Sequence, residues 1–175
     1  MNSLDREQFI ANNQPEVDFK CAFRKGQMFE EYISALFDKK SGRFEFLNAS
    51  STNAPVYGIN AAQSLFPDLK ILCGIRRKKY KFAIECKWRE QFTNGKIHWA
   101  TADQIQNYLN YQRGYRIPVY VAIGIGGQPS KPEKLFVTPL LQISEKVEVA
   151  EEHLMLFQRK TTRGFFYDAK QLKLF

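Results

Sequence analysis

Residues 67–88 have the sequence PDLKILCGIRRKKYKFAIECKW, which is the most informative segment for the fold. Two runs rich in apolar residues, 69–75 and 80–88, lie on either side of the basic residues 76–79. Two strand-like runs joined by a short polar segment are typical of an antiparallel β-hairpin. The stretch therefore predicts two neighbouring strands of one sheet.

The second of these strands carries charged residues within an otherwise apolar run. Because alternate residues of a strand share a face, Glu85 and Lys87 should lie on the same face. Burying charge is costly unless the charge is paired or bound to a metal, so this pair is unusual in a core strand. The opposite face should be apolar and consist of Phe82, Ile84, Cys86 and Trp88.

The turn of the hairpin brings a third charged residue towards this pair. If the turn centres near Arg77 and Lys78, the numbers of paired residues sum to about 155. Asp68 then falls opposite Lys87, within one or two residues. The spacing alone predicts that Asp68, Glu85 and Lys87 converge at one end of the sheet.

Such a cluster suits phosphodiester hydrolysis. Asp68 and Glu85, with water and the backbone carbonyl of Cys86, could hold Mg²⁺ or Mn²⁺, since hard cations prefer oxygen ligands. The metal would polarise a phosphate and lower the pKa of a bound water, and Lys87 would position or deprotonate that water. The alternative is a structural salt-bridge cluster at the end of a sheet.

The motif Pro67-Asp68, followed after sixteen residues by Glu85-Cys86-Lys87, resembles that of the PD-(D/E)xK nuclease superfamily. The superfamily carries a helix with an acidic residue before the motif, and residues 26–30 resemble it. At roughly 100° per residue, Glu30 lies at the border of the apolar stripe of that helix, whereas Glu31 points away. After the motif, residues 104–108 resemble the QxxxY signature of some branches, with Gln104 and Tyr108 as its ends.

The resemblance covers residues 26–124 and implies a restriction-endonuclease-like core, metal-dependent cleavage of DNA, and Glu30 and Gln104 as further site residues. It also implies that a homodimer or a partner subunit is worth testing, because many enzymes with this fold act as dimers. The alternative for Gln104 is structural, since residues 101–104 fit a helix capping box.

The remaining pattern predicts an α/β fold with a mixed central sheet and flanking helices. Thr101 is expected to cap the helix after the motif, with Gly114 just past its end. The expected helices are a short one with a connector in 1–24, then 26–38 and 102–113. The expected further strands are 44–47, 118–124 and 135–138, with 163–168 and 171–175 supplying an edge, and 48–66 is expected to be a surface loop.

The 175 residues suit a single domain, with the recognisable core at 26–124 and a C-terminal extension at 130–175. No apolar run is long enough for a membrane helix and no signal core begins the chain, so we expect a cytoplasmic protein with no membrane partner. The cysteines, Cys21, Cys73 and Cys86, are expected to be reduced thiols. Neither histidine has neighbours at zinc-ligand spacing.

The net charge of +8 favours a polyanionic partner, and DNA is the expected one. Arg89, Lys96, Trp99 and Tyr108 are the candidates for contacts with nucleic acid, although Tyr108 also suits core packing. The basic residues 76–79 lie too far from Asp68 for the catalytic cleft, and are expected to be a solvated turn or a secondary contact with long DNA.

The sequence therefore favours a metal-dependent deoxyribonuclease, an endonuclease of modest sequence selectivity. Two other readings stay open. One is a non-catalytic nucleic-acid-binding module on the same fold, and the other is a protein-interaction subunit of a larger defence or repair assembly. Metal-dependent cleavage separates the first from the second, and salt-dependent DNA affinity separates both from the third.

Overall fold

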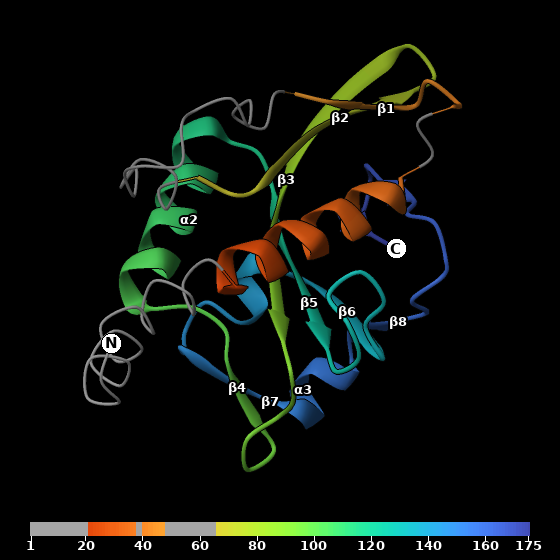
Figure 1. Ribbon diagram of the computed structural model, residues 1–175. Helices are drawn as coiled ribbons and strands as arrows, with labels where there is room; N and C mark the ends of the chain where they lie inside the picture. The colour runs from red at the N-terminus through yellow and green to blue at the C-terminus, as the bar shows by residue number, and fades with distance from the viewer. Residues whose placement is uncertain (1–20, 38–39, 48–65) are drawn as a thin grey trace, which may run out of the picture.

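The structure is a computed structural model that describes residues 21–37, 40–47 and 66–175. The hairpin predicted from residues 67–88 is present as β2 (Leu69–Ile75) and β3 (Lys78–Arg89), which pair antiparallel (Figure 1). The turn lies at Arg76 and Arg77, one residue earlier than predicted, so Leu69 pairs with Ile84. The expected N-terminal segment up to residue 20 and most of the expected surface loop, 48–65, lie outside the described residues.

The hairpin is part of a six-stranded mixed sheet in the order β1-β2-β3-β5-β6-β8. Only β3 and β5 run parallel, and every other neighbouring pair is antiparallel. The prediction of a mixed central sheet is therefore confirmed. The other four strands of this sheet are β1 (Phe44–Phe46), β5 (Val119–Ile125), β6 (Lys134–Pro139) and β8 (Gln158–Arg159).

The parallel connection from β3 to β5 runs through the short strand β4 (Lys96–His98) and helix α2 (Ala102–Tyr115). Thr101 caps α2 as predicted, because its side chain accepts from the Gln104 amide while Gln104 bonds back to the Thr101 amide. The predicted end of the helix is wrong by two residues. Arg116 takes the left-handed conformation that stops the helix, and Gly114 lies within its last turn.

The helix before the hairpin covers residues 21–35, so the predicted start at 26 is too late and the predicted end at 38 is too late as well. Phe29 and Ile33 of the helix, and Phe37 just beyond its end, recur every four residues and are buried. The ring of Phe29 lies against Gly124 of β5, where a Cβ would be 2.4 Å from the ring. A glycine in the sheet therefore allows this helix to approach closely.

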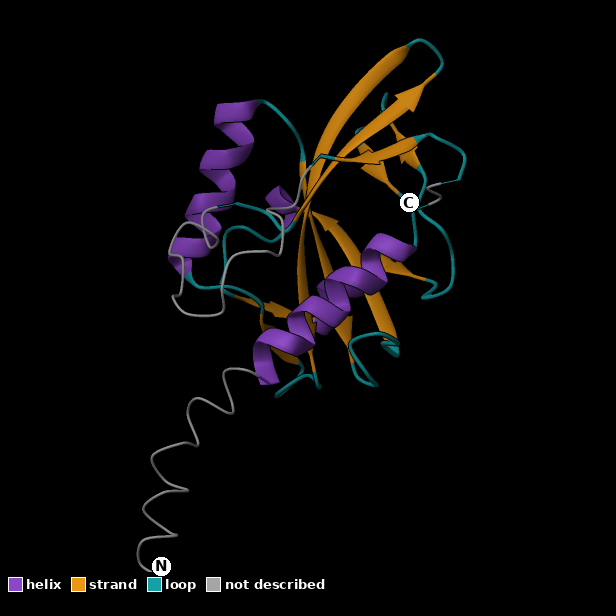
Figure 2. Cartoon of the chain, turned by 45° about the horizontal axis from the view of Figure 1, so that its top comes forward, coloured by secondary structure: helices purple, strands orange, loops and turns teal. Residues whose placement is uncertain are grey.

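The two helices cover opposite faces of the sheet (Figure 2). Helix 21–35 packs on the face that carries Phe82, Ile84 and Cys86, as the alternation along β3 predicted. Helix α2 packs on the face that carries Ala83, Val121 and Ile123. The result is three layers, helix, sheet and helix.

The C-terminal extension adds smaller elements to both faces. On the α2 side are η2 (Leu140–Gln142), β7 (Glu148–Ala150), which pairs with β4, and α3 (Glu151–Met155). Segments 163–168 and 171–175 were predicted as an edge of the sheet, but β9 (Tyr167–Asp168) and β10 (Lys173–Leu174) form a separate two-stranded sheet. Tyr167 stacks on Phe82 at 4.6 Å between ring centroids, which places this hairpin on a face of the central sheet.

None of the helices in the described part of the chain is both long enough and apolar enough to cross a membrane. The three cysteines are free thiols, and Cys73 and Cys86 are buried.

Candidate active site

The site forms where β2 stops and β3 continues. Pairing of the two strands reaches from Ile75 and Lys78 to Leu69 and Ile84, while β3 extends beyond this point to Arg89. Asp68 directly precedes β2, and its Oδ2 atom accepts a hydrogen bond from the Cys86 amide at 2.7 Å. The carboxylate of Asp68 thus takes the place of the next backbone acceptor in the ladder, which fixes it beside β3.

Glu85 is the central residue of the site and is only 2% exposed. Its Oε1 atom lies 2.6 Å from Nζ of Lys87, on the same face of β3. The same oxygen accepts a hydrogen bond of 2.6 Å from the hydroxyl of Tyr108 on α2. The other oxygen, Oε2, is buried and has no hydrogen-bond partner among the described residues.

Glu30 approaches from the helix on the other side of the sheet. It lies one residue after the buried Phe29 and is partly exposed, whereas Glu31 is exposed, in agreement with the helical geometry. Burial and the negative charge of Glu85 raise the pKa of Glu30 to about 7. This effect of Glu85 means that the two carboxyl groups are close enough to repel each other when ionised.

The other two charged groups of the site belong to the same electrostatic cluster. Burial, together with the charges of Glu85 and Glu30, raises the pKa of Asp68 well above its usual range. Burial acts to lower the pKa of Lys87, but the contact with Glu85 and the charge of Asp68 outweigh it and the pKa is raised. Lys87 supplies one positive charge against three carboxyl groups, those of Glu30, Asp68 and Glu85. An added cation would therefore be stabilised among them.

The donor set suits a hard divalent cation. In the described residues, no three His, Cys, Asp or Glu side chains form a cluster that could hold a metal by themselves. The predicted ligands, however, are two carboxylates and a backbone carbonyl. In an extended strand the N–H and C=O of one residue point to the same side, so the Cys86 carbonyl lies on the side of Asp68, which accepts from its amide. The Oε2 atom of Glu85, which has no partner among the described residues, would supply the remaining oxygen.

The structure assigns different surroundings to the two ends of the QxxxY pattern. Gln104 makes both bonds of the capping box, so the structural alternative accounts for its side chain. Tyr108 was predicted as a contact with nucleic acid. It is only 2% exposed and its hydroxyl donates to Glu85, so its side chain is not available for that contact. Its packing beside Ile105 was visible in the sequence, whereas its bond to Glu85 depends on how α2 lies on the sheet.

Two other predicted nucleic-acid contacts have structural surroundings. Trp99 is 0% exposed and its indole N–H donates to the Lys146 carbonyl, so the prediction that it contacts nucleic acid is wrong. The guanidinium group of Arg89 donates to three carbonyl groups, and any contact with nucleic acid would compete with these bonds. Lys96 is exposed on β4, and its role stays a prediction.

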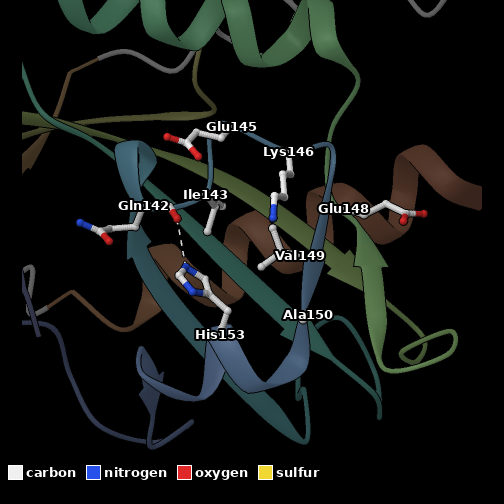
Figure 3. A pocket seen from close by; sticks show the side chains of 8 residues that line it. All are labelled: Gln142, Ile143, Glu145, Lys146, Glu148, Val149, Ala150 and His153. Carbon is white, nitrogen blue, oxygen red and sulfur yellow. Dashed lines mark hydrogen bonds between the residues drawn. The ribbon is translucent and has the colours of Figure 1, made fainter.

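A pocket in the C-terminal extension lies apart from these groups. It is lined by side chains between Gln142 and His153, and Nε2 of His153 lies 3.0 Å from the carbonyl of Gln142 (Figure 3). None of Glu30, Asp68, Glu85 and Lys87 lines it. The candidate chemistry is therefore at the end of β2 and not in this pocket.

No protein-family model and no curated protein matches the sequence. Among solved structures, the chain is similar to Hjc, a Holliday junction resolvase from the archaeal hyperthermophile Archaeoglobus fulgidus. The TM-score is 0.49 at 18% sequence identity, and the match covers 78% of this chain and 97% of the resolvase chain.

Proposed function

We propose that this protein is a Mg²⁺- or Mn²⁺-dependent nuclease that hydrolyses phosphodiester bonds of DNA, acting as an endonuclease. The observation that carries the proposal is the buried Oε2 atom of Glu85, which has no hydrogen-bond partner in the described part of the chain, on a carboxylate whose charge acts on Asp68 and Glu30. Leaving a buried carboxylate oxygen without a partner costs on the order of 1–3 kcal/mol or more, because it has lost its water. A divalent cation bound by Asp68, Glu85 and the Cys86 carbonyl would offset this cost.

Each residue then has a distinct role. Asp68, fixed by the Cys86 amide, and Glu85, fixed by Tyr108, would hold the metal in a set geometry. Lys87 would position the attacking water and stabilise charge on the phosphate from its place beside Glu85. Glu30 would support the site from the opposite helix. The bound ion would polarise the phosphate and lower the pKa of the water.

DNA is proposed as the substrate because of the net charge of +8 and the resemblance of residues 26–124 to PD-(D/E)xK nucleases. Selectivity for sequence is expected to be modest, since the described residues all belong to the core and its small additions. The proposal includes a partner protein, or a second copy of this chain, that directs the nuclease to its DNA site.

One observation favours a second candidate, a non-catalytic nucleic-acid-binding module. Oε1 of Glu85 already has two partners, Lys87 and Tyr108, as a structural polar cluster would. Such a module predicts DNA binding that is unaffected by loss of Asp68.

The deciding experiment is cleavage of supercoiled plasmid with Mg²⁺ or Mn²⁺, and of linear, four-way-branched and single-stranded DNA. Wild-type protein is compared with Asp68→Ala and Lys87→Ala, and Glu31→Gln serves as control because Glu31 is exposed on the same helix as Glu30. We expect cutting by wild type and Glu31→Gln only, with all four proteins folded. Equal cutting by all would indicate another centre, and binding without cutting on any substrate would favour the second candidate.

A further inference from the structure

The outer part of the β2–β3 hairpin, residues 72–81, is a basic arm. It extends beyond both helices in Figures 1 and 2. No acidic residue occurs between Asp68 and Glu85 in the sequence. None of the basic residues at its end forms an ion pair with a described residue, and all are exposed: Arg76, Arg77, Lys78, Lys79 and Lys81. These charges therefore form no ion pair that would stabilise the described part of the fold.

Two of these lysines lie on the face of β3 that carries the candidate site. Because side chains alternate along a strand, Lys79 and Lys81 share a face with Glu85 and Lys87. Their partners on β2 are Gly74, which has no side chain, and Leu72. The twist of the strand turns this face gradually along the arm. The two lysines, which we call the arm lysines, are therefore attached to the site by one continuous strand.

The length of that strand fixes how far the arm lysines lie from the site. At about 3.3 Å per residue, the six residues from Lys81 to Lys87 span roughly 20 Å, and the eight from Lys79 span roughly 26 Å. Duplex DNA rises about 3.4 Å per base pair, so these distances correspond to roughly six to eight base pairs.

We propose that the arm lysines, Lys79 and Lys81, bind the phosphate backbone of duplex DNA roughly six to eight base pairs from the phosphate held at Glu85 and Lys87. The contact at Glu85 and Lys87 rests on the proposed function. A duplex suits the spacing because it is stiff over about 150 base pairs, so two contacts 20 Å apart cost it little bending energy or entropy. A flexible single strand would have to be ordered between them.

The inference is tested by DNA binding as a function of duplex length. Lys79→Gln/Lys81→Gln is compared with the unchanged arm, both in buffer with EDTA, so that no DNA is cut and Lys87 is kept. Affinities are measured by fluorescence anisotropy for a hairpin duplex of about 4 base pairs, which is too short to reach both contacts, for a duplex of about 20 base pairs, and for a single strand of the longer length. The matched control is Lys170→Gln/Lys173→Gln, which removes two exposed lysines near β10, on the opposite face of the sheet.

We expect the arm variant to lose on the order of tenfold in affinity for the long duplex and little for the short one. The slope of log affinity against log salt should fall by roughly two for the long duplex, because two phosphate contacts are lost. The control should change both duplexes by the same small factor. All variants should keep the melting temperature of the parent, since the substituted residues are exposed.

Three results would overturn the inference. Equal losses for short and long duplexes would mean that the lysines act only through overall charge. An equal or larger loss for the single strand would assign the arm to that substrate. A loss of binding to anionic lipid vesicles with DNA binding unchanged would assign it to a membrane surface.

The test is independent of whether the protein cuts DNA. Length-dependent loss of binding, together with a wild type that cuts nothing, would support the arm contact and reject the nuclease. If Asp68→Ala abolishes cutting but DNA affinity is the same with and without the arm lysines, the nuclease is supported and the arm contact is rejected.

Discussion

At the scale of single residues, Tyr108 is the group that most directly controls the geometry of Glu85. Its hydroxyl donates to Oε1, and burial together with the charge of Glu85 raises the pKa of Tyr108, so that it remains a donor at any physiological pH. With Oε1 also facing Lys87, Glu85 is left with only Oε2 for a ligand. In the proposed nuclease the tyrosine would therefore act through Glu85, as a positioning residue.

Tyr108→Phe keeps the ring and removes this hydrogen bond. We expect cleavage in saturating Mg²⁺ to fall by about tenfold to a hundredfold and the Mg²⁺ requirement to rise, because groups that orient metal ligands typically have effects of that size. Stability should fall by about 1–2 kcal/mol. Plasmid cleavage across a Mg²⁺ titration and urea unfolding measure the two effects.

The control for this change is Tyr111→Phe, a buried tyrosine one turn further along α2 whose ring packs in the same core. It should leave the Mg²⁺ requirement unchanged. If both variants shift the requirement equally, the effect belongs to the packing of α2 and not to the bond with Glu85.

At the scale of elements, the position of Glu30 depends on a contact between a helix and a strand. Gly124 of β5 lies directly beneath Phe29, the neighbour of Glu30. Gly124→Ala would place a methyl group 2.4 Å from the Phe29 ring, and because this ring is buried we expect the helix to shift outwards with it. We expect a loss of about 1–3 kcal/mol from overpacking, and reduced cleavage because Glu30 moves with the helix. Chemical unfolding and plasmid cleavage test both.

Gly114→Ala is the matched control. Gly114 lies in α2 with nothing within 4 Å of an added Cβ. Alanine is favoured over glycine in a helix by up to about 1 kcal/mol, so this change should be neutral or stabilising. Equal destabilisation by both glycine substitutions would contradict the proposed contact with Phe29.

The elements also show what the sequence can and cannot predict. The β2–β3 hairpin, the alternation of faces along β3 and the capping box at Thr101 are local patterns, and the structure confirms them. The prediction that Asp68 lies near Glu85 and Lys87 followed from counting residues along the two paired strands. Trp99 could not be placed in this way, because it is buried by the C-terminal extension, where it donates to Lys146, 47 residues away.

The C-terminal hairpin gives the same lesson. Its strands are only two residues long each, and local pattern alone cannot say whether such a pair joins a sheet edge or packs on a face. Stacking of Tyr167 on Phe82 decides this, and that contact joins residues far apart in the sequence. Local periodicity thus predicts elements and their faces, whereas long-range packing decides which polar or aromatic side chains remain accessible.

At the scale of the whole molecule, the carboxyl cluster makes stability depend on pH in metal-free buffer. Burial and Glu85 raise the pKa of Glu30 from 4.5 to about 7 in the folded protein. A group whose pKa is raised by folding contributes its full stabilisation below its unfolded pKa and loses it as the pH rises through the folded pKa. We therefore expect the free energy of unfolding to fall between about pH 4.5 and 7, by on the order of 3 kcal/mol at most.

Divalent metal should reverse this trend, because the ion competes with protons for the same oxygens. Saturating Mg²⁺ should raise the melting temperature clearly at pH 8 and very little at pH 5, where the acids are protonated. A ligand at about a hundredfold over its dissociation constant adds about 2.7 kcal/mol. Thermal unfolding with and without Mg²⁺ at both pH values tests this without any nuclease assay. Asp68→Ala should abolish the rise in melting temperature caused by Mg²⁺. Glu30→Gln should flatten the dependence of stability on pH in metal-free buffer, whereas Glu31→Gln should leave that dependence unchanged. An equal gain at both pH values, or one that survives Asp68→Ala, would place the ion elsewhere.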